Sequence, residues 1–201
     1  MNIYNTPKID SDPNSTEVIE DNTPVLFKVV DEIGPHQISL YIGNGEGAEC
    51  SELLMREGIT QSLNIGINIF PLPLTLPDGI ELRRMQIGMI DAEGNDPHIL
   101  MAAVLALHGA VETYMSGKPH YPVHKKGNIL VHCRGGRSRS LIVLALYLHL
   151  RQPERFSTLK SSIEHVRSCR GCGSEHPAPG MWALAEQVLL DLPSKLFKWR
   201  K

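Results

Sequence analysis

The sequence has few cysteines and few long apolar stretches, and both shortages limit the class of protein. Four cysteines in 201 residues are too few for the disulfide framework of a small secreted scaffold. The longest apolar run, Leu141–Leu148, has eight residues, whereas a membrane-spanning helix needs about 18. The first 23 residues are polar and acidic, without the apolar segment of a signal peptide. We therefore expect a cytoplasmic protein without stable membrane insertion.

An excess of charge of one sign is also missing. The 20 Lys and Arg residues nearly balance 22 Asp and Glu residues, for a formal net charge of −2. This balance argues against a nucleic-acid partner held by bulk positive charge. The distribution is uneven, however: residues 113–153 carry seven basic and no acidic side chains, while the rest carries 13 basic against 22 acidic. A basic stretch in an acidic chain indicates a local anion site.

Strand-like and helical patterns alternate along the chain, which predicts one domain with an α/β fold. The strand-like runs are Val25–Val30, Ile38–Ile42, Ile59–Ile65, Met85–Ile90 and Asn128–His132. The helical patterns cover residues 47–57, 97–116, 140–150, 157–168 and 180–190. We expect residues 1–24 to be a flexible acidic leader, residues 25–194 to be the domain and residues 195–201 to be a short basic tail.

The most informative segment is a buried strand, a loop with two glycines and a buried helix in succession. The loop places Arg139 six residues after Cys133. Cys50 and Arg56 have the same spacing, but they enclose a helical pattern without glycine. We therefore interpret Cys50 as a packing residue and assign chemistry to Cys133.

The composition of the Cys133 loop suits an anion. Gly135 and Gly136 permit the backbone dihedrals that turn successive N–H groups inward. The following helix N-terminus also attracts negative charge, and Arg139 can bind two phosphate oxygens with its planar fork. The same field favours the thiolate form of Cys133, which makes it a candidate nucleophile inside a phosphate-sized cradle.

The pattern His-Cys-x-x-Gly-x-x-Arg-Ser, from His132 to Ser140, resembles the signature loop of cysteine-dependent protein phosphatases. The segments Leu40–Asn44, Gly58–Asn64 and His176–Met181 resemble the dual-specificity branch, so that the resemblance covers about residues 25–192. It implies an atypical dual-specificity phosphatase with a single catalytic domain. The implied fold is a central mixed, mostly parallel sheet flanked by helices, and the implied chemistry needs no metal and no cofactor.

The resemblance also implies roles for individual residues. Cys133 attacks phosphorus and forms a phosphocysteine, Ser140 stabilises the departing thiolate, and His132 helps to fix the loop and tune Cys133. An aspartic acid protonates the leaving oxygen and then activates water. The implied phosphate-binding residues are Arg134, Gly135, Gly136, Arg137, Ser138 and Arg139.

Two aspartates are candidates for the acid. Asp96 precedes Pro97 and is explained by a helix-capping role, whereas Asp91 opens a loop after a strand, where the family keeps its acid. We favour Asp91. The chain from Asp91 to Cys133 is longer than usual for the branch, which fits an insertion at residues 117–127. We expect that insertion, with Lys118, Lys125 and Lys126, to lie far from the chemistry, at the other end of the strand.

The sequence leaves more than one class of substrate open. Basic residues at both Arg134 and Arg137 are typical of superfamily members that act on phosphoinositides or inositol phosphates. We place phosphotyrosine and phosphoserine or phosphothreonine of proteins first and a polyphosphorylated small molecule or lipid second. An inactive phosphate-binding module is the alternative from another class, and the oligomeric state stays open.

A separate segment near the C-terminal end of the sequence contains four residues that could bind zinc. As an alternative, Cys169 and Cys172 could form a redox pair. The residues are His165, Cys169, Cys172 and His176. Only one Cys-x-x-Cys pair exists and the segment spans a helix end, so we favour an ordinary loop without metal.

Overall fold

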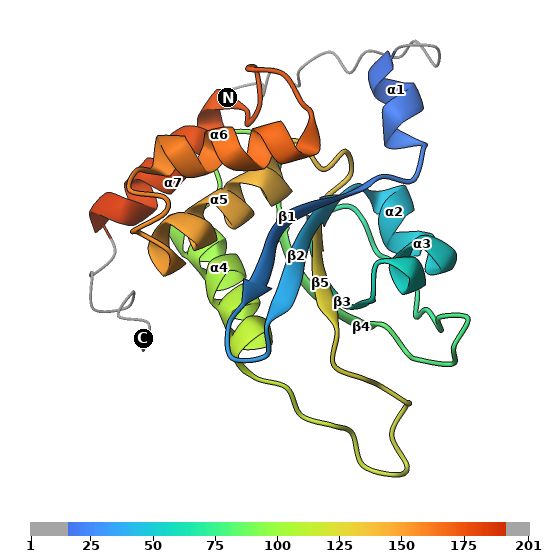
Figure 1. The fold of residues 1–201 in the computed structure, drawn as a ribbon. Helices are drawn as coiled ribbons and strands as arrows, with labels where there is room; N and C mark the ends of the chain where they lie inside the picture. The colour runs from blue at the N-terminus through green and yellow to red at the C-terminus, as the bar shows by residue number, and fades with distance from the viewer. Residues whose placement is uncertain (1–15, 192–201) are drawn as a thin grey trace.

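A five-stranded sheet forms the centre of the computed structural model, which describes residues 16–191 (Figure 1). The strand order is β1-β2-β5-β3-β4, and β1 is antiparallel to β2 while the other neighbours are parallel. The strands are β1 (Leu26–Ile33), β2 (Ile38–Gly43), β3 (Ile59–Gly66), β4 (Arg83–Met89) and β5 (Asn128–His132). The predicted mixed, mostly parallel sheet is confirmed.

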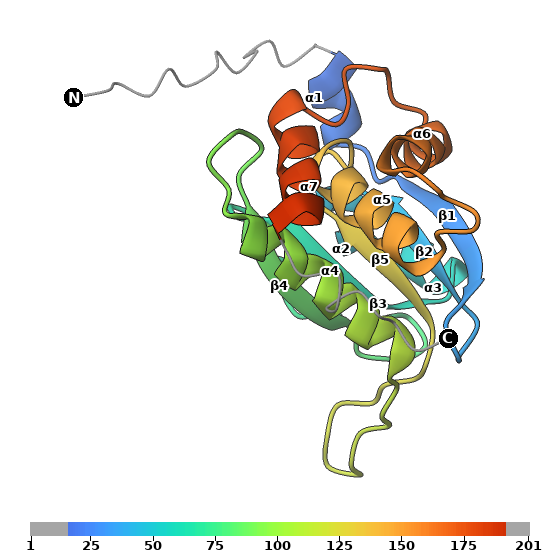
Figure 2. The same ribbon diagram turned by 90° about the vertical axis from the view of Figure 1, so that its left-hand side faces the viewer.

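Helices cover both faces of this sheet, as Figures 1 and 2 show. On one face lie α2 (Gly45–Glu49) and α3 (Ser51–Arg56). The larger layer on the opposite face is formed by α4 (Pro97–Glu112), α5 (Arg139–Arg151), α6 (Leu159–Arg170) and α7 (Pro179–Asp191). Burial on both faces agrees with the burial of every residue of β2 and β3, including the polar residues of β3.

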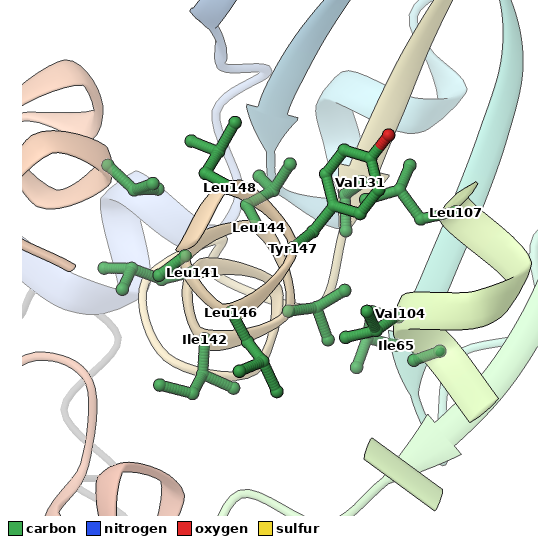
Figure 3. Packing of buried hydrophobic residues seen from close by; sticks show 14 of the residues in the cluster. Ile65, Val104, Leu107, Val131, Leu141, Ile142, Leu144, Leu146, Tyr147 and Leu148 are labelled. Atoms are coloured by element: carbon green, nitrogen blue, oxygen red, sulfur yellow. The ribbon is translucent and has the colours of Figure 1, made fainter. Parts of the chain in front are cut away.

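The central helix of the larger layer is α5, whose residues 140–148 are all buried. Its side chains meet Val131 of β5, Ile65 of β3 and Val104 of α4 in the main apolar core (Figure 3). A second cluster, which includes Tyr41 and Leu54, fills the face under α2 and α3. Two cores therefore hold β5 from both sides, and this fixes the strand that leads into Cys133.

The elements differ from the predicted ones mainly at breaks and ends. The predicted helix at residues 47–57 is interrupted by Cys50, whose extended backbone separates α2 from α3. The helix predicted to reach residue 116 ends earlier, with Thr113 in extended conformation as its C-cap. The predicted β5 strand is confirmed with the same bounds.

The segment at residues 113–127 is a long loop that enters the N-terminal end of β5 (Figure 1). It is held there by the Val123 carbonyl, which accepts a hydrogen bond from the Glu81 backbone at 2.7 Å, and by a Lys125–Asp78 ion pair. Because Cys133 follows the opposite end of β5, the structure places the lysines of this loop away from the catalytic segment.

Part of the expected flexible leader is a folded helix, α1 (Thr16–Asp21). The physical reason is a set of ion pairs with the Cys133 loop and hydrogen bonds to Asn44, which are described below. The rest of the expected leader, residues 1–15, and the expected tail, residues 195–201, lie outside the described residues. None of the helices within residues 16–191 is both long and apolar enough to cross a bilayer.

Candidate active site

The end of β5, the following loop and the start of α5 bring the candidate nucleophile to the carboxyl edge of the parallel strands. Sites in such sheets gather at this edge. Cys133 is only 1% exposed, and its Sγ lies 3.4 Å from the Oγ of Ser140 on the first turn of α5. The strand therefore delivers a buried sulfur that has a hydroxyl partner.

The loop between Cys133 and Arg139 depends on one glycine and on contacts with its neighbours. Gly136 has φ +69°, and a Cβ atom there would overlap the Gly43 carbonyl at the end of β2. The backbone N–H of Gly45 donates to the Arg134 carbonyl at 2.9 Å, and the Ala178 N–H donates to the Ser138 Oγ at 3.1 Å. The cradle is thus tied to elements on both faces of the sheet.

Arg139 links the cradle to the loop that follows β4. Its guanidinium donates to the Met89 carbonyl at 3.2 Å, and its Nε lies 3.4 Å from the Oδ2 of Asp91. The Asp91 loop is closed by Asn95, whose side chain accepts from the Ile90 N–H at 3.0 Å and donates to the Ile90 carbonyl at 2.9 Å. The structure thus brings Asp91 to the edge of the Cys133 loop.

Asp96, the other candidate acid, has a different environment. Its Oδ1 accepts a hydrogen bond from the His98 backbone N–H at 2.8 Å and caps α4, and the same oxygen lies 2.8 Å from the His98 ring. These bonds lower the pKa of Asp96, with the backbone hydrogen bond as the largest cause. A carboxyl group held ionised by a cap is poorly suited to give up a proton.

His132 is fully buried beside the nucleophile. Burial, with the charge of Arg84 as a smaller cause, lowers the pKa of His132 to about 3. Its imidazole is therefore neutral at physiological pH, and it contributes shape and a polar ring rather than positive charge to the base of the loop.

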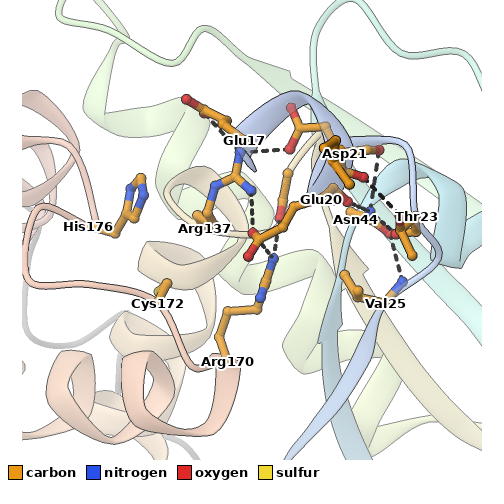
Figure 4. A network of polar contacts seen from close by, with 12 residues as sticks. Glu17, Glu20, Asp21, Thr23, Val25, Asn44, Arg137, Arg170, Cys172 and His176 are labelled. Carbon is orange, nitrogen blue, oxygen red and sulfur yellow. Dashed lines mark hydrogen bonds and ion pairs between the residues drawn. The ribbon is translucent and has the colours of Figure 1, made fainter. Parts of the chain in front are cut away.

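Arg134 and Arg137, which the sequence predicts to bind phosphate, are paired with carboxylates of α1 in the structure. Arg137 is 8% exposed and its guanidinium is bound by carboxylates of α1 (Figure 4). Arg134 pairs with Asp21 at 3.3 Å. Burial opposes the charge of Arg137, but Asp21 and Glu17 outweigh it and raise the pKa of Arg137. The other predicted phosphate ligands, Gly135, Gly136, Ser138 and Arg139, lie together in the loop.

Two residues of this region escaped the sequence analysis. Asn44 is fully buried, accepts from the Val25 and Gly47 N–H groups and donates to the Thr23 carbonyl at 2.7 Å. Arg170, at the end of α6, donates to the Gly135 carbonyl at 3.1 Å. Asn44 has a local signal only as the cap of α2, three residues before Gly47. Its contacts with residues 20–25, and the contact of Arg170 with Gly135, join distant segments and leave no local signal.

The cysteine and histidine cluster near the end of α6 is engaged in ordinary packing. The His165 Nε2 donates to the Val29 carbonyl at 2.8 Å, which removes that nitrogen as a metal ligand. Burial raises the pKa of both Cys169 and Cys172, which disfavours the thiolates that metals bind. Within residues 16–191, no group of three or more metal-ligating side chains is arranged to hold an ion.

A cavity of about 390 Å³ opens beside the catalytic segment. Its polar wall includes His132, Arg134 and Glu46, and its apolar wall includes Phe70 and Leu72, both about three-quarters exposed. Exposed apolar side chains in a cavity that the sequence neighbours of Cys133 also line are suited to contact the body of a substrate.

Comparisons with known proteins agree with this geometry. No family model matches the chain. Dual specificity phosphatase 28 of Mus musculus is 32% identical over 145 residues, which span 72% of this chain and 76% of the relative. The Homo sapiens protein of that name is 30% identical over the same length and is covered to 70%. The chain therefore belongs to the dual-specificity phosphatase family.

Solved structures show the same fold. A mouse putative dual specificity phosphatase complexed with zinc tungstate has a TM-score of 0.63 and 25% identity, with 89% of this chain and 95% of that chain covered. Human DUSP28 has a TM-score of 0.59 and 25% identity, with 83% and 95% covered. The chain is accordingly a cysteine-dependent phosphatase of the dual-specificity branch, as the loop pattern predicts.

Proposed function

We propose that this phosphatase hydrolyses phosphotyrosine, phosphoserine or phosphothreonine of proteins through a phosphocysteine at Cys133. The observation that carries the proposal is the buried Cys133 Sγ, 3.4 Å from the Ser140 Oγ, at the base of a glycine loop that ends in Arg139. This arrangement combines a nucleophile, backbone donors and a planar cation around a phosphate-sized space.

In the first step, the Cys133 sulfur attacks phosphorus and the bond to the leaving oxygen breaks. Arg139 and the loop N–H groups hold the equatorial oxygens, where negative charge develops. Asp91 donates its proton to the leaving oxygen. When phosphate enters, Arg139 exchanges its contact with Asp91 for contacts with phosphate oxygens, which frees the carboxyl group for proton transfer.

In the second step, the Asp91 carboxylate takes a proton from water, and the resulting hydroxide attacks the phosphocysteine. The S–P bond breaks, inorganic phosphate forms and the electron pair returns to the Cys133 sulfur. The Ser140 hydroxyl stabilises the departing thiolate by donating a hydrogen bond to its sulfur. His132 supports the loop in its neutral form, since its pKa is lowered to about 3.

A phosphoprotein is the substrate class best supported. The carboxylates of α1 offset the charges of Arg134 and Arg137, so the loop offers one free phosphate site rather than a broad basic surface. Phe70 and Leu72 add apolar surface to the cavity that His132 and Arg134 also line, as a peptide requires and an inositol phosphate does not. The alternative substrates remain phosphoinositides and inositol polyphosphates.

We also propose a reducing compartment, the cytoplasm, as the place of action. The chemistry requires a free Cys133 thiol, and all four cysteines are unpaired. Oxidation of Cys133 would stop the reaction.

The test is hydrolysis of 4-nitrophenyl phosphate by the full chain, followed by a panel of phosphopeptides, phosphoinositides and inositol phosphates. Wild type should turn over the aryl phosphate, Cys133→Ser should be inert, and phosphopeptides should give the highest kcat/KM. A wild type that is inert from pH 5 to 8 would support the phosphate-binding module instead. Preference for inositol phosphates would overturn the substrate assignment while leaving the mechanism intact.

A further inference from the structure

Helix α1 presents three carboxylates to a single arginine of the catalytic loop. Glu17, Glu20 and Asp21 lie on one face of the helix because they are spaced three and four residues apart. Their oxygens lie 2.8, 2.9 and 2.6 Å from the Arg137 guanidinium nitrogens, respectively (Figure 4). One buried cation therefore has three anionic partners from a segment more than 100 residues away.

Two further arginines extend this contact. The second carboxylate oxygen of Asp21 lies 3.3 Å from the Arg134 Nε, and Glu20 lies 3.5 Å from Arg170. Arg170 is 4% exposed and also donates to the Gly135 carbonyl of the catalytic loop. The three arginines thus form a basic cluster on the outer side of the loop that holds Cys133.

The carboxylates lie close to the catalytic loop. A Cβ atom at Gly135 would be 2.6 Å from the Asp21 Oδ1, so only a glycine admits this carboxylate. Planar guanidinium groups bind carboxylate and phosphate oxygens with the same geometry. A cluster that accepts three carboxylates is equally suited to the oxygens of a phosphate group attached near the one that reacts.

We infer that Arg134, Arg137 and Arg170 form a second anion-binding site beside the catalytic loop, and that the α1 carboxylates occupy it and exclude ligands with clustered phosphates. Glu17, Glu20 and Asp21 are then specificity-determining residues. This inference rests on the proposed function only in placing the reacting phosphate at Cys133. The excluded ligand class is a small scaffold that carries several phosphates, either free or as a lipid headgroup.

The experiment measures binding rather than turnover, in the full chain with Cys133→Ser. Inositol hexakisphosphate is titrated calorimetrically into this protein and into the same protein with Glu17→Gln, Glu20→Gln and Asp21→Asn. Removal of the three carboxylates should lower the Kd at least tenfold. Adding Arg137→Ala to this variant should abolish most of the gain, since the site then loses its central cation.

The matched control removes three negative charges elsewhere, with the exposed residues Glu52, Glu154 and Glu164 each replaced by Gln. It should change the Kd less than twofold, which is below the gain expected of the α1 variants. An equal gain in the control, or no gain in the α1 variant with either inositol hexakisphosphate or the lipid vesicles, would overturn the inference. Vesicles that contain phosphatidylinositol bisphosphate form a second arm, and a gain confined to them identifies a lipid headgroup as the source of the phosphates.

Two measurements keep the outcome interpretable. The thermal unfolding midpoint of each variant is recorded. If the triple variant does not fold, Glu17→Gln is used alone, because Glu17 is the most exposed of the three carboxylates and its replacement disturbs the fold least. This single variant should lower the Kd two- to threefold. Hydrolysis of 4-nitrophenyl phosphate is measured with Cys133 restored. If the wild type is active and the α1 variant binds no more tightly, the inference alone is wrong. If the α1 variant binds more tightly and the wild type is inactive, the proposed function alone is wrong.

Discussion

The Nε of Arg139 lies 3.4 Å from the Oδ2 of Asp91, so the arginine of the catalytic loop and the second residue after β4 form an ion pair. The contact joins two loops that leave different strands at the same edge of the sheet. It places Asp91, which is partly exposed, within reach of a phosphate held by Arg139. The relationship supports a distinct role for Asp91 that Asp96, bound to the first turn of α4, does not share.

The two aspartates should therefore respond differently to neutralisation. Asp91→Asn should lower kcat/KM for phenyl phosphate about 100- to 10,000-fold, the usual contribution of a general acid, and much less for 4-nitrophenyl phosphate. Asp96→Asn should leave both values within about threefold, because asparagine is an equally good helix cap. The measurement is kcat/KM across aryl phosphates of increasing leaving-group pKa, because kcat/KM reports the step in which the leaving group departs. Equal losses in the two variants, or the reverse order, would move the acid to Asp96.

Asn95 is expected to position the acid without touching substrate. Its side chain closes the Asp91 loop through the Ile90 backbone and also donates to the Ala92 carbonyl at 3.0 Å. Asn95→Ala should lower kcat/KM for phenyl phosphate about tenfold, through kcat rather than KM, and less for 4-nitrophenyl phosphate. This dependence on the leaving group separates a positioning role from general destabilisation, which would reduce both rates by the same factor.

The chemical centre of the site was predictable because its signals are local in the sequence. The glycine loop between a buried strand and a buried helix predicts where Cys133 and Arg139 lie, and both ends of β5 agree with the predicted strand. The location of Asp91 at this edge was predictable from its place after a strand, and its role as the acid stays a prediction. These features depend on adjacent residues and on the rule that parallel strands share their carboxyl edge.

The surroundings of Arg137 were not predictable in the same way. The acidic residues of α1 could be recognised as one helical face from their spacing, but nothing local indicates that this face contacts a loop about 120 residues later. Asn44 joins the end of α1 to β2 by side-chain hydrogen bonds that leave no periodic pattern. Long-range polar contacts of this kind explain why residues 16–21 form a helix where the sequence predicts a flexible leader.

Gly136 should be less replaceable than another glycine with the same backbone conformation. Gly171 has φ +71° at the C-cap of α6, and among the described residues no atom lies within 4 Å of a Cβ placed there. Gly171→Ala should therefore cost only the left-handed strain, about 1–2 kcal/mol of unfolding free energy. Gly136→Ala adds an overlap with the Gly43 carbonyl and should cost about 1–3 kcal/mol more.

Urea unfolding of both alanine variants tests this difference, and vanadate inhibition of the folded fraction tests the cradle. Gly136→Ala should weaken vanadate binding at least tenfold, while Gly171→Ala should leave it unchanged. If the two variants lose the same stability and bind vanadate equally well, the close approach of Gly136 to Gly43 is not important to the loop.

Acid should destabilise the protein through His132. Because burial lowers the pKa of this imidazole to about 3 in the folded chain, whereas an unfolded histidine titrates near 6.5, the unfolded state binds more protons between these values. Stability is therefore complete above about pH 6.5 and falls as the pH decreases toward 3, with a loss from this residue of about 2 kcal/mol between pH 7 and 5. Burial also lowers the pKa of His108 and His124, so these residues add to the loss of stability at low pH.

Urea unfolding of wild type and His132→Gln at pH 7, 6 and 5 isolates the contribution of His132, because the other histidines are common to both proteins. The variant should lose about 2 kcal/mol less than wild type over this range, and parallel pH profiles would show that His132 takes up its proton in the folded state.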